Sequence, residues 1–146
     1  MLKTKFLFFL LFAITLHTFS QDNIIINSGH SYSVHNFSSA NNQLFSCDNR
    51  GTLMVWDIAK KTLTKKLQIS YLQIRNMVVN FDGTRVAIVE TDTISSFKLS
   101  VWDLQNDKKL FSHRMEELPL FIEFSPKGSY IVYSNKIGRA SCRERV

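Results

Sequence analysis

The chain has 146 residues, enough for one domain of ordinary size. Its formal net charge of +6 arises mainly at the two ends, because without residues 1–20 and 137–146 the 18 basic and 12 acidic residues become 13 and 11. The remaining charge of about +2 is too small to indicate a nucleic acid or an anionic membrane surface as partner.

The first segment has the pattern of an export signal. Residues 1–5 contain two lysines, and residues 6–16 form an apolar run. This run is too short for a transmembrane helix, which needs ~20 residues. We expect a signal peptide over residues 1–20, cleaved between Ser20 and Gln21, and a mature protein in the periplasm, the cell envelope or the extracellular space. Beyond this cleaved segment the sequence predicts no membrane anchor.

Two kinds of landmark recur along the mature chain. Trp56–Asp57 and Trp102–Asp103 each end an alternating apolar stretch, and they lie 46 residues apart. Turns followed by strand-like segments begin at residues 38, 80 and 125, which are 42 and 45 residues apart. This spacing falls near the period of a propeller blade, which is one four-stranded sheet.

Runs of β-branched and aromatic residues between turn residues predict strands and no long helix. In the first repeat we expect strands at residues 24–26, 33–37, 43–47, 52–56 and 63–68. In the second repeat we expect them at residues 74–79, 85–89, 98–102 and 110–114, and in the third at residues 121–124 and 130–133. The predicted fold is all-β, an incomplete propeller of about two and a half blades, each a four-stranded antiparallel sheet, over residues 21–136.

The first repeat resembles the WD40 repeat family, from Gly29 and His30 to Trp56 and Asp57. In that family a histidine, a serine or threonine, an aspartate and the tryptophan form a hydrogen-bonded chain inside the blade. By position, the resemblance implies that His30, Ser46, Arg50 and Trp56 take these roles.

Arg50 departs from the family pattern, because a cation cannot accept a proton from the histidine. We therefore expect a partial network in a blade that depends on apolar packing. The second repeat keeps Trp102 and Asp103 but has Ser70 and Tyr71 about where the Gly–His pair is expected. The resemblance extends from Gly29 to about Ser134.

No residue of this sequence is predicted to be catalytic or to bind a metal or a cofactor. A histidine can act as a base or ligand, but no second histidine or carboxylate stands at ligand spacing from His30, so we expect it to bond within its blade. His35 and His113 stand alone on strands and are expected at the surface or at a sheet edge. Asp57 and Asp103 recur in successive repeats, which favours a role in turns over catalysis.

Two further features have both a chemical and a structural interpretation. Cys47 lies in a strand without a neighbouring base, so a buried inert thiol is expected in place of a nucleophile. Four lysines flank one hairpin and could contact an acidic partner, but we favour solvated side chains that protect a sheet edge. They are Lys60, Lys61, Lys65 and Lys66.

The last segment, IGRASCRERV at residues 137–146, resembles the translation of a sequencing-library adapter. We expect it to be a non-native tail and leave it out of the fold prediction. Without its cysteine, Cys47 has no partner for an internal disulfide.

The sequence favours a protein-interaction scaffold with a protein or peptide partner, as the exported N-terminal part of a larger protein. The alternatives are a propeller enzyme of lactonase or dehydrogenase type, a caspase-like peptidase in a further C-terminal part, and a disc that adheres to carbohydrate.

Overall fold

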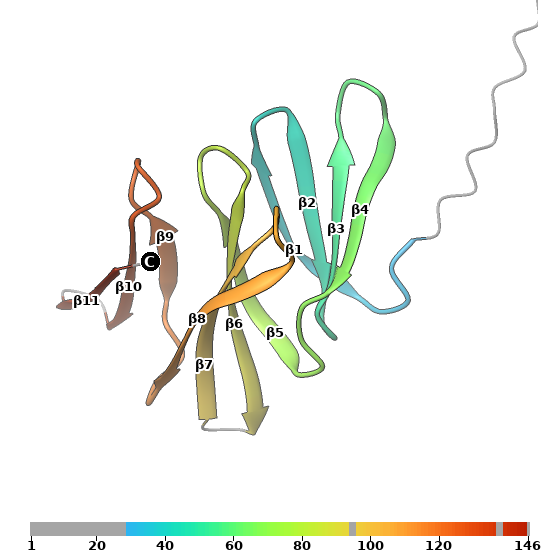
Figure 1. The fold of residues 1–146 in the computed structure, drawn as a ribbon. Helices are drawn as coiled ribbons and strands as arrows, with labels where there is room; N and C mark the ends of the chain where they lie inside the picture. The colour runs from blue at the N-terminus through green and yellow to red at the C-terminus, as the bar shows by residue number, and fades with distance from the viewer. Residues whose placement is uncertain (1–28, 94–95, 137–138, 146) are drawn as a thin grey trace, which may run out of the picture.

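The computed structural model describes residues 29–93, 96–136 and 139–145, so the expected signal peptide and the strand expected at residues 24–26 lie outside the described residues. The described part consists of strands in three antiparallel sheets that stand side by side (Figure 1). No helix in these ranges is long and apolar enough to cross a membrane.

The first sheet has its strands in chain order. They are β1 (Val34–Ala40), β2 (Gln43–Asp48), β3 (Thr52–Asp57) and β4 (Thr62–Gln68). The β1–β2 hairpin turns at Asn41 and Asn42, whose φ angles of 47° and 59° are positive. Asparagine tolerates this region, which a two-residue hairpin with right-handed strand twist requires.

The second sheet repeats the same order, and the third contains three strands. The second comprises β5 (Gln73–Val79), β6 (Arg85–Thr93), β7 (Ser96–Asp103) and β8 (Lys108–Met115). The third comprises β9 (Phe121–Phe124), β10 (Tyr130–Lys136) and β11 (Arg139–Arg145), with β10 in the middle. The fold is thus an incomplete β-propeller with two complete blades and part of a third, as the sequence predicted.

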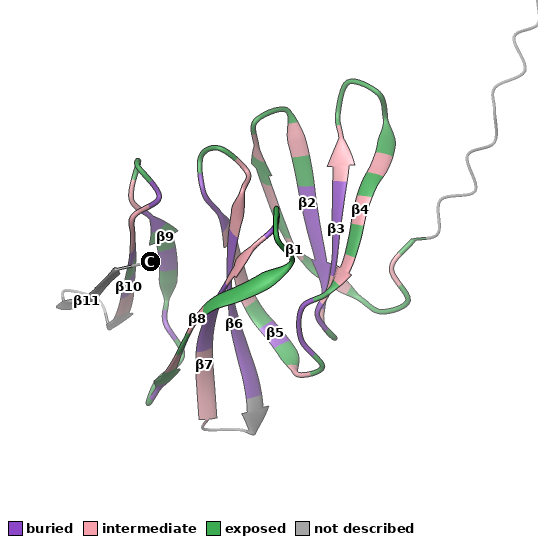
Figure 2. Cartoon of the chain, in the orientation of Figure 1, coloured by how far each residue is buried: buried purple, intermediate pink, exposed green. Residues whose placement is uncertain are grey.

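The sheets pack face to face through two apolar layers, and the buried residues lie along the middle strands (Figure 2). Phe45, Leu53 and Ile88 belong to the layer between the first two sheets, and Leu99 and Ile131 belong to the layer between the second and third. All five are fully buried. Each such side chain contributes about 1.5–3 kcal/mol when buried, so the sheets stabilise one another.

Strand bounds agree with the prediction within a few residues, except at two places. Strands were expected at residues 85–89 and 98–102, but β6 continues to Thr93 and β7 begins at Ser96, because Thr91 pairs with Phe97 and Thr93 with Ser96. The tail left out of the fold prediction supplies β11, which pairs with β10 along its backbone. Backbone hydrogen bonding places few demands on side-chain identity, so a strand can form there whatever the origin of its sequence.

Candidate functional site

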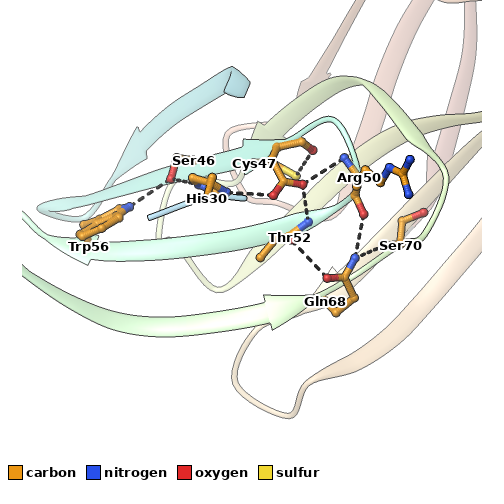
Figure 3. A network of polar contacts seen from close by, with 9 residues as sticks. His30, Ser46, Cys47, Arg50, Thr52, Trp56, Gln68 and Ser70 are labelled. Atoms are coloured by element: carbon orange, nitrogen blue, oxygen red, sulfur yellow. Dashed lines mark hydrogen bonds and ion pairs between the residues drawn. The ribbon is translucent and has the colours of Figure 1, made fainter. Parts of the chain in front are cut away.

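A chain of hydrogen bonds crosses the first blade from its third strand to the segment before its first. The indole Nε1 of Trp56 donates to Ser46 Oγ at 3.0 Å, and Ser46 Oγ lies 2.8 Å from His30 Nε2. Trp56 comes from β3, Ser46 from β2 and His30 from the segment before β1 (Figure 3). The three residues named by position in the sequence are therefore brought together.

The carboxylate of this network is Asp48, and the prediction that Arg50 stands in its place was wrong. Asp48 Oδ2 lies 3.3 Å from His30 Nδ1, and its Oδ1 accepts the backbone N–H groups of Arg50 at 3.0 Å and Thr52 at 2.9 Å. The Arg50 guanidinium instead lies over the ring of Tyr32, 4.8 Å from its centroid. The first blade thus holds a complete network.

The donors fix the direction of the protons along this network. The Trp56 indole N–H can only donate to Ser46 Oγ, and the Asp48 carboxylate can only accept. His30 therefore bears a proton on Nδ1, and in that tautomer its Nε2 accepts from the Ser46 hydroxyl. The Nδ1 proton is donated to Asp48, which is fully buried. Burial alone would raise the pKa of the Asp48 carboxyl, but the hydrogen bonds from Thr52, Arg50 and His30 outweigh burial and hold that pKa below its ordinary value. The aspartate remains ionised at neutral pH and acts as a structural acceptor.

The turn after Asp48 depends on glycine. Gly51 has a φ of 79°, and a Cβ there would lie 2.5 Å from the backbone oxygen of Ser70. Neither the angle nor the space suits another residue. This close approach brings the segment that leads into the second blade against the turn of the first, where Ile69 N–H donates to Gly51 O at 2.9 Å.

The strand registers show which residues of the second blade correspond to this network. Trp56 pairs with Leu44 of β2, and Trp102 pairs with Val86 of β6. Ser46 and Ile88 each lie two residues after these partners, so Ile88 occupies in the second blade the position that Ser46 has in the first. Asp48 pairs with Val34 and Glu90 with Ile74, so Glu90 corresponds to Asp48.

His30 lies four residues before Val34, the strand partner of Asp48. Ser70 lies four residues before Ile74, the strand partner of Glu90. Ser70 therefore takes the place of His30 in the second blade. The pair Ser70–Tyr71 was expected about where the first repeat has Gly29–His30, and the register places Ser70, not Tyr71, at the position of the histidine.

Glu90 is the centre of a different buried network. Its carboxylate accepts from Ser70 Oγ, from Ser100 Oγ at 2.9 Å and from Lys98 Nζ at 2.7 Å. Burial alone would raise the pKa of Glu90, but Lys98 first, then Ser70 and Ser100, lower it below its ordinary value. Sequence reasoning missed Glu90 and Lys98, because only the strand register makes Glu90 the counterpart of Asp48.

Because the second blade has Ile88 where the first has Ser46, it contains a buried hydrogen-bond donor without an acceptor among the described residues. Ile88 offers no oxygen where Ser46 does, and the Nε1 of Trp102 finds no hydrogen-bond partner among the described residues. The Lys109 ammonium lies 5.1 Å from the centroid of the Trp102 ring. The two tryptophans that mark the repeat in the sequence therefore have different polar surroundings.

Asp57 and Asp103 are the last residues of β3 and β7, next to hairpin turns, and neither carboxylate belongs to the networks of Asp48 and Glu90. Asp57 Oδ1 accepts from the Lys60 N–H at 2.9 Å, which is the main cause of its lowered pKa. Asp103 accepts from the side chain of Asn106 at 2.8 Å, the main cause of its lowered pKa, and from the Gln105 N–H at 2.8 Å. Both carboxylates order the turns that connect the outer strands.

The remaining candidates are spread over the sheets. Cys47 is fully buried, and burial, followed by the charge of Asp48, raises the pKa of its thiol to about 12. His35 is exposed, and His113 is half-buried and stacks on Phe111. Within residues 29–91 and 96–134, whose side chains are described, no three histidine, cysteine, aspartate or glutamate side chains gather in a way that could hold a metal ion.

The lysines at the β3–β4 hairpin do not share one environment. Lys60 is exposed and pairs with Asp57 at 3.5 Å. Lys65 lies 2.5 Å from Asp107 of the next blade and donates to the backbone oxygen of Leu104. The prediction of a solvated role was therefore wrong for Lys65, which links two neighbouring blades.

A family model described as an N-terminal beta-propeller domain matches residues 24–143. The chain belongs to this family. The match covers both complete blades and the third sheet as far as residue 143, so family and fold agree on a β-propeller domain. No curated protein matches the chain.

Proposed function

We propose that this N-terminal β-propeller domain is a WD40-type scaffold that binds another protein or a peptide through the loops at the ends of its blades. The observation that carries the proposal is that the two buried carboxylates bond within the blades. Asp48 and Glu90 each accept hydrogen bonds from groups of their own blade. They hold strands and turns in place, as a rigid platform requires.

The WD40 assignment rests on the first blade. His30, Ser46, Trp56 and Asp48 form the chain of contacts that the family resemblance implies, with the aspartate two residues earlier than the sequence suggested. The second blade is a modified copy with Ser70 and Ile88 in place of the histidine and the serine. These contacts support a structural role for the pairs at Trp56–Asp57 and Trp102–Asp103.

Large apolar side chains at both ends of the blades support a binding role. Tyr71, between β4 and β5, is 86% exposed, and Phe81, between β5 and β6, is 85% exposed. Aromatic residues of this kind are enriched where proteins bind one another. We propose a non-enzymatic role, with a protein or peptide as partner and no nucleic acid.

The proposal includes export and a larger protein. The lysines and apolar run at residues 1–16 favour a cleaved signal peptide and a site of action in the periplasm, cell envelope or extracellular space. The description of the family as an N-terminal domain is consistent with a further domain downstream.

Photo-crosslinking tests the binding role. A photoreactive phenylalanine analogue replaces Tyr71, Phe81 or, as a control on the outer strand β4, the exposed Lys66, and each full chain is illuminated in extract of its native cell envelope. The proposal predicts crosslinks to one protein, identified by mass spectrometry, at Tyr71 or Phe81 and none at Lys66. Equal crosslinking at all three positions, or none at any, would overturn it.

A further inference from the structure

A recess of about 330 Å³ opens beside the second blade. One wall is the segment between β4 and β5, which includes Ser70 and Tyr71. The others are formed by side chains of β6, β7 and β8, namely Glu90, Lys98, Trp102 and Lys109. Ser70 stands where the first blade has His30, and a serine is smaller by an imidazole ring. The recess therefore lies where the second blade departs from the first.

The recess carries an excess of positive charge. Lys98 and Lys109 line it, and Arg114 lines a smaller adjoining recess of about 140 Å³ that shares Lys98 and Glu90. Glu90 is the only acid among the described residues that line either space. Its carboxylate already accepts from Lys98, Ser70 and Ser100, so three cations face a single anion that is bonded within the blade.

Hydrogen-bond donors remain available on the same walls. The Lys98 side chain is 37% exposed, and its ammonium has three N–H groups, of which one is directed to Glu90 Oε1. The Lys109 ammonium lies over the Trp102 ring, whose own N–H has no acceptor among the described residues. Tyr71 adds an exposed aromatic ring at the rim. A ligand that supplies acceptors and negative charge would complete this arrangement.

We infer that this recess binds a carboxylate of an acidic peptide segment, held by Lys98 and Lys109 beside the Trp102 ring. The inference rests on the proposed function, because it names the chemistry of the partner that the scaffold binds. The carboxylate belongs either to an aspartate or glutamate side chain or to the end of a chain. The volume suits a few side chains and not an extended polymer.

Calorimetric titration of the full chain tests the inference with three peptides. The first is acetyl-Gly-Glu-Glu-Gly-amide, the second its glutamine analogue, and the third acetyl-Gly-Gly-Gly-Gly with a free carboxyl end. A change in tryptophan fluorescence on peptide addition that is lost in Trp102→Phe reports on binding near the Trp102 ring.

We expect saturable binding of the glutamate peptide, weakened by salt and about tenfold weaker for Lys109→Gln, because one charge-assisted contact is lost. Lys66→Gln, a matched change of an exposed lysine on β4, should leave the affinity unchanged. Circular dichroism verifies that both variants keep their sheets. Binding of the third peptide in place of the first would assign the carboxylate to a chain terminus.

The inference is overturned if neither carboxylate peptide binds saturably, if the glutamine analogue binds equally well, or if Lys66→Gln weakens binding as much as Lys109→Gln. These outcomes are separate from the crosslinking result. Crosslinks at Tyr71 or Phe81 without binding of acidic peptides would support the proposed scaffold function and contradict only the inference that its partner is acidic.

Discussion

His30 Nδ1 lies 3.3 Å from Asp48 Oδ2, and this contact joins the segment before β1 to the end of β2. The same carboxylate accepts the N–H groups of Arg50 and Thr52, so one side chain orders both a turn and the segment before the first strand. The stability of the first blade should therefore depend strongly on Asp48.

Asp48→Ala removes an acceptor from three donors, and we expect the free energy of unfolding to fall by about 2–4 kcal/mol, since buried donors lose their partner. Arg50→Ala removes only a stacking contact on Tyr32 and should cost less than about 1 kcal/mol. Urea denaturation followed by circular dichroism measures both. A larger loss for Arg50→Ala than for Asp48→Ala would restore the assignment first suggested by sequence position.

The pH dependence of stability follows from the same carboxylates. Hydrogen bonds hold the pKa values of Asp48 and Glu90 below their ordinary values in the folded chain. A lowered folded-state pKa stabilises the protein above the unfolded value, which is about 4, and this stabilisation is lost as the pH falls through the folded values. The contribution of these two carboxylates to the denaturation midpoint should thus be constant from about pH 7 to 5 and fall at lower pH.

The decline at acidic pH should be shallower for Asp48→Asn and for Glu90→Gln, because neither variant has a carboxyl group to protonate at that position. Glu123→Gln, at an exposed position of β9, is the control for the loss of one negative charge. A decline as steep in both buried variants as in the unchanged chain would assign the acid sensitivity to other groups.

Gly51 should not tolerate a side chain. We expect Gly51→Ala to destabilise the chain by about 1–3 kcal/mol, because it combines a positive φ with a close approach to Ser70. Gly29→Ala is the matched control, since a Cβ there meets nothing within 4 Å. Thermal unfolding compares the two, and equal effects would mean that the turn is not constrained as described.

The Trp102 indole, which has no acceptor among the described residues, predicts a measurable energetic coupling between positions 88 and 102. Ile88→Ser destabilises by loss of apolar burial, but it also places a hydroxyl where Ser46 stands in the first blade. In a double-mutant cycle with Trp102→Phe, we expect Ile88→Ser to cost about 0.5–1.5 kcal/mol more when the indole is absent. Strictly additive effects would show that the two blades do not correspond residue by residue at this point.

The sequence was sufficient to predict the sheets but not to identify the buried carboxylates Asp48 and Glu90. Alternating apolar residues and turn residues predicted the strands because burial on one face of a sheet imposes a period of two. Asp48 was missed because the resemblance assigned the role of the aspartate by position to Arg50, whereas the acid lies two residues earlier. Glu90 became recognisable only when the pairing of Ile74 with Glu90 fixed the register.

The most direct test of the buried network in the first blade is ¹⁵N NMR of the His30 imidazole at neutral pH, with His35 and His113 as internal comparisons. The hydrogen-bond order predicts a slowly exchanging proton on Nδ1, which is lost in Asp48→Ala, and an Nε2 that accepts from Ser46. A ring protonated at Nε2, or an Nδ1 proton unaffected by Asp48→Ala, would contradict the network.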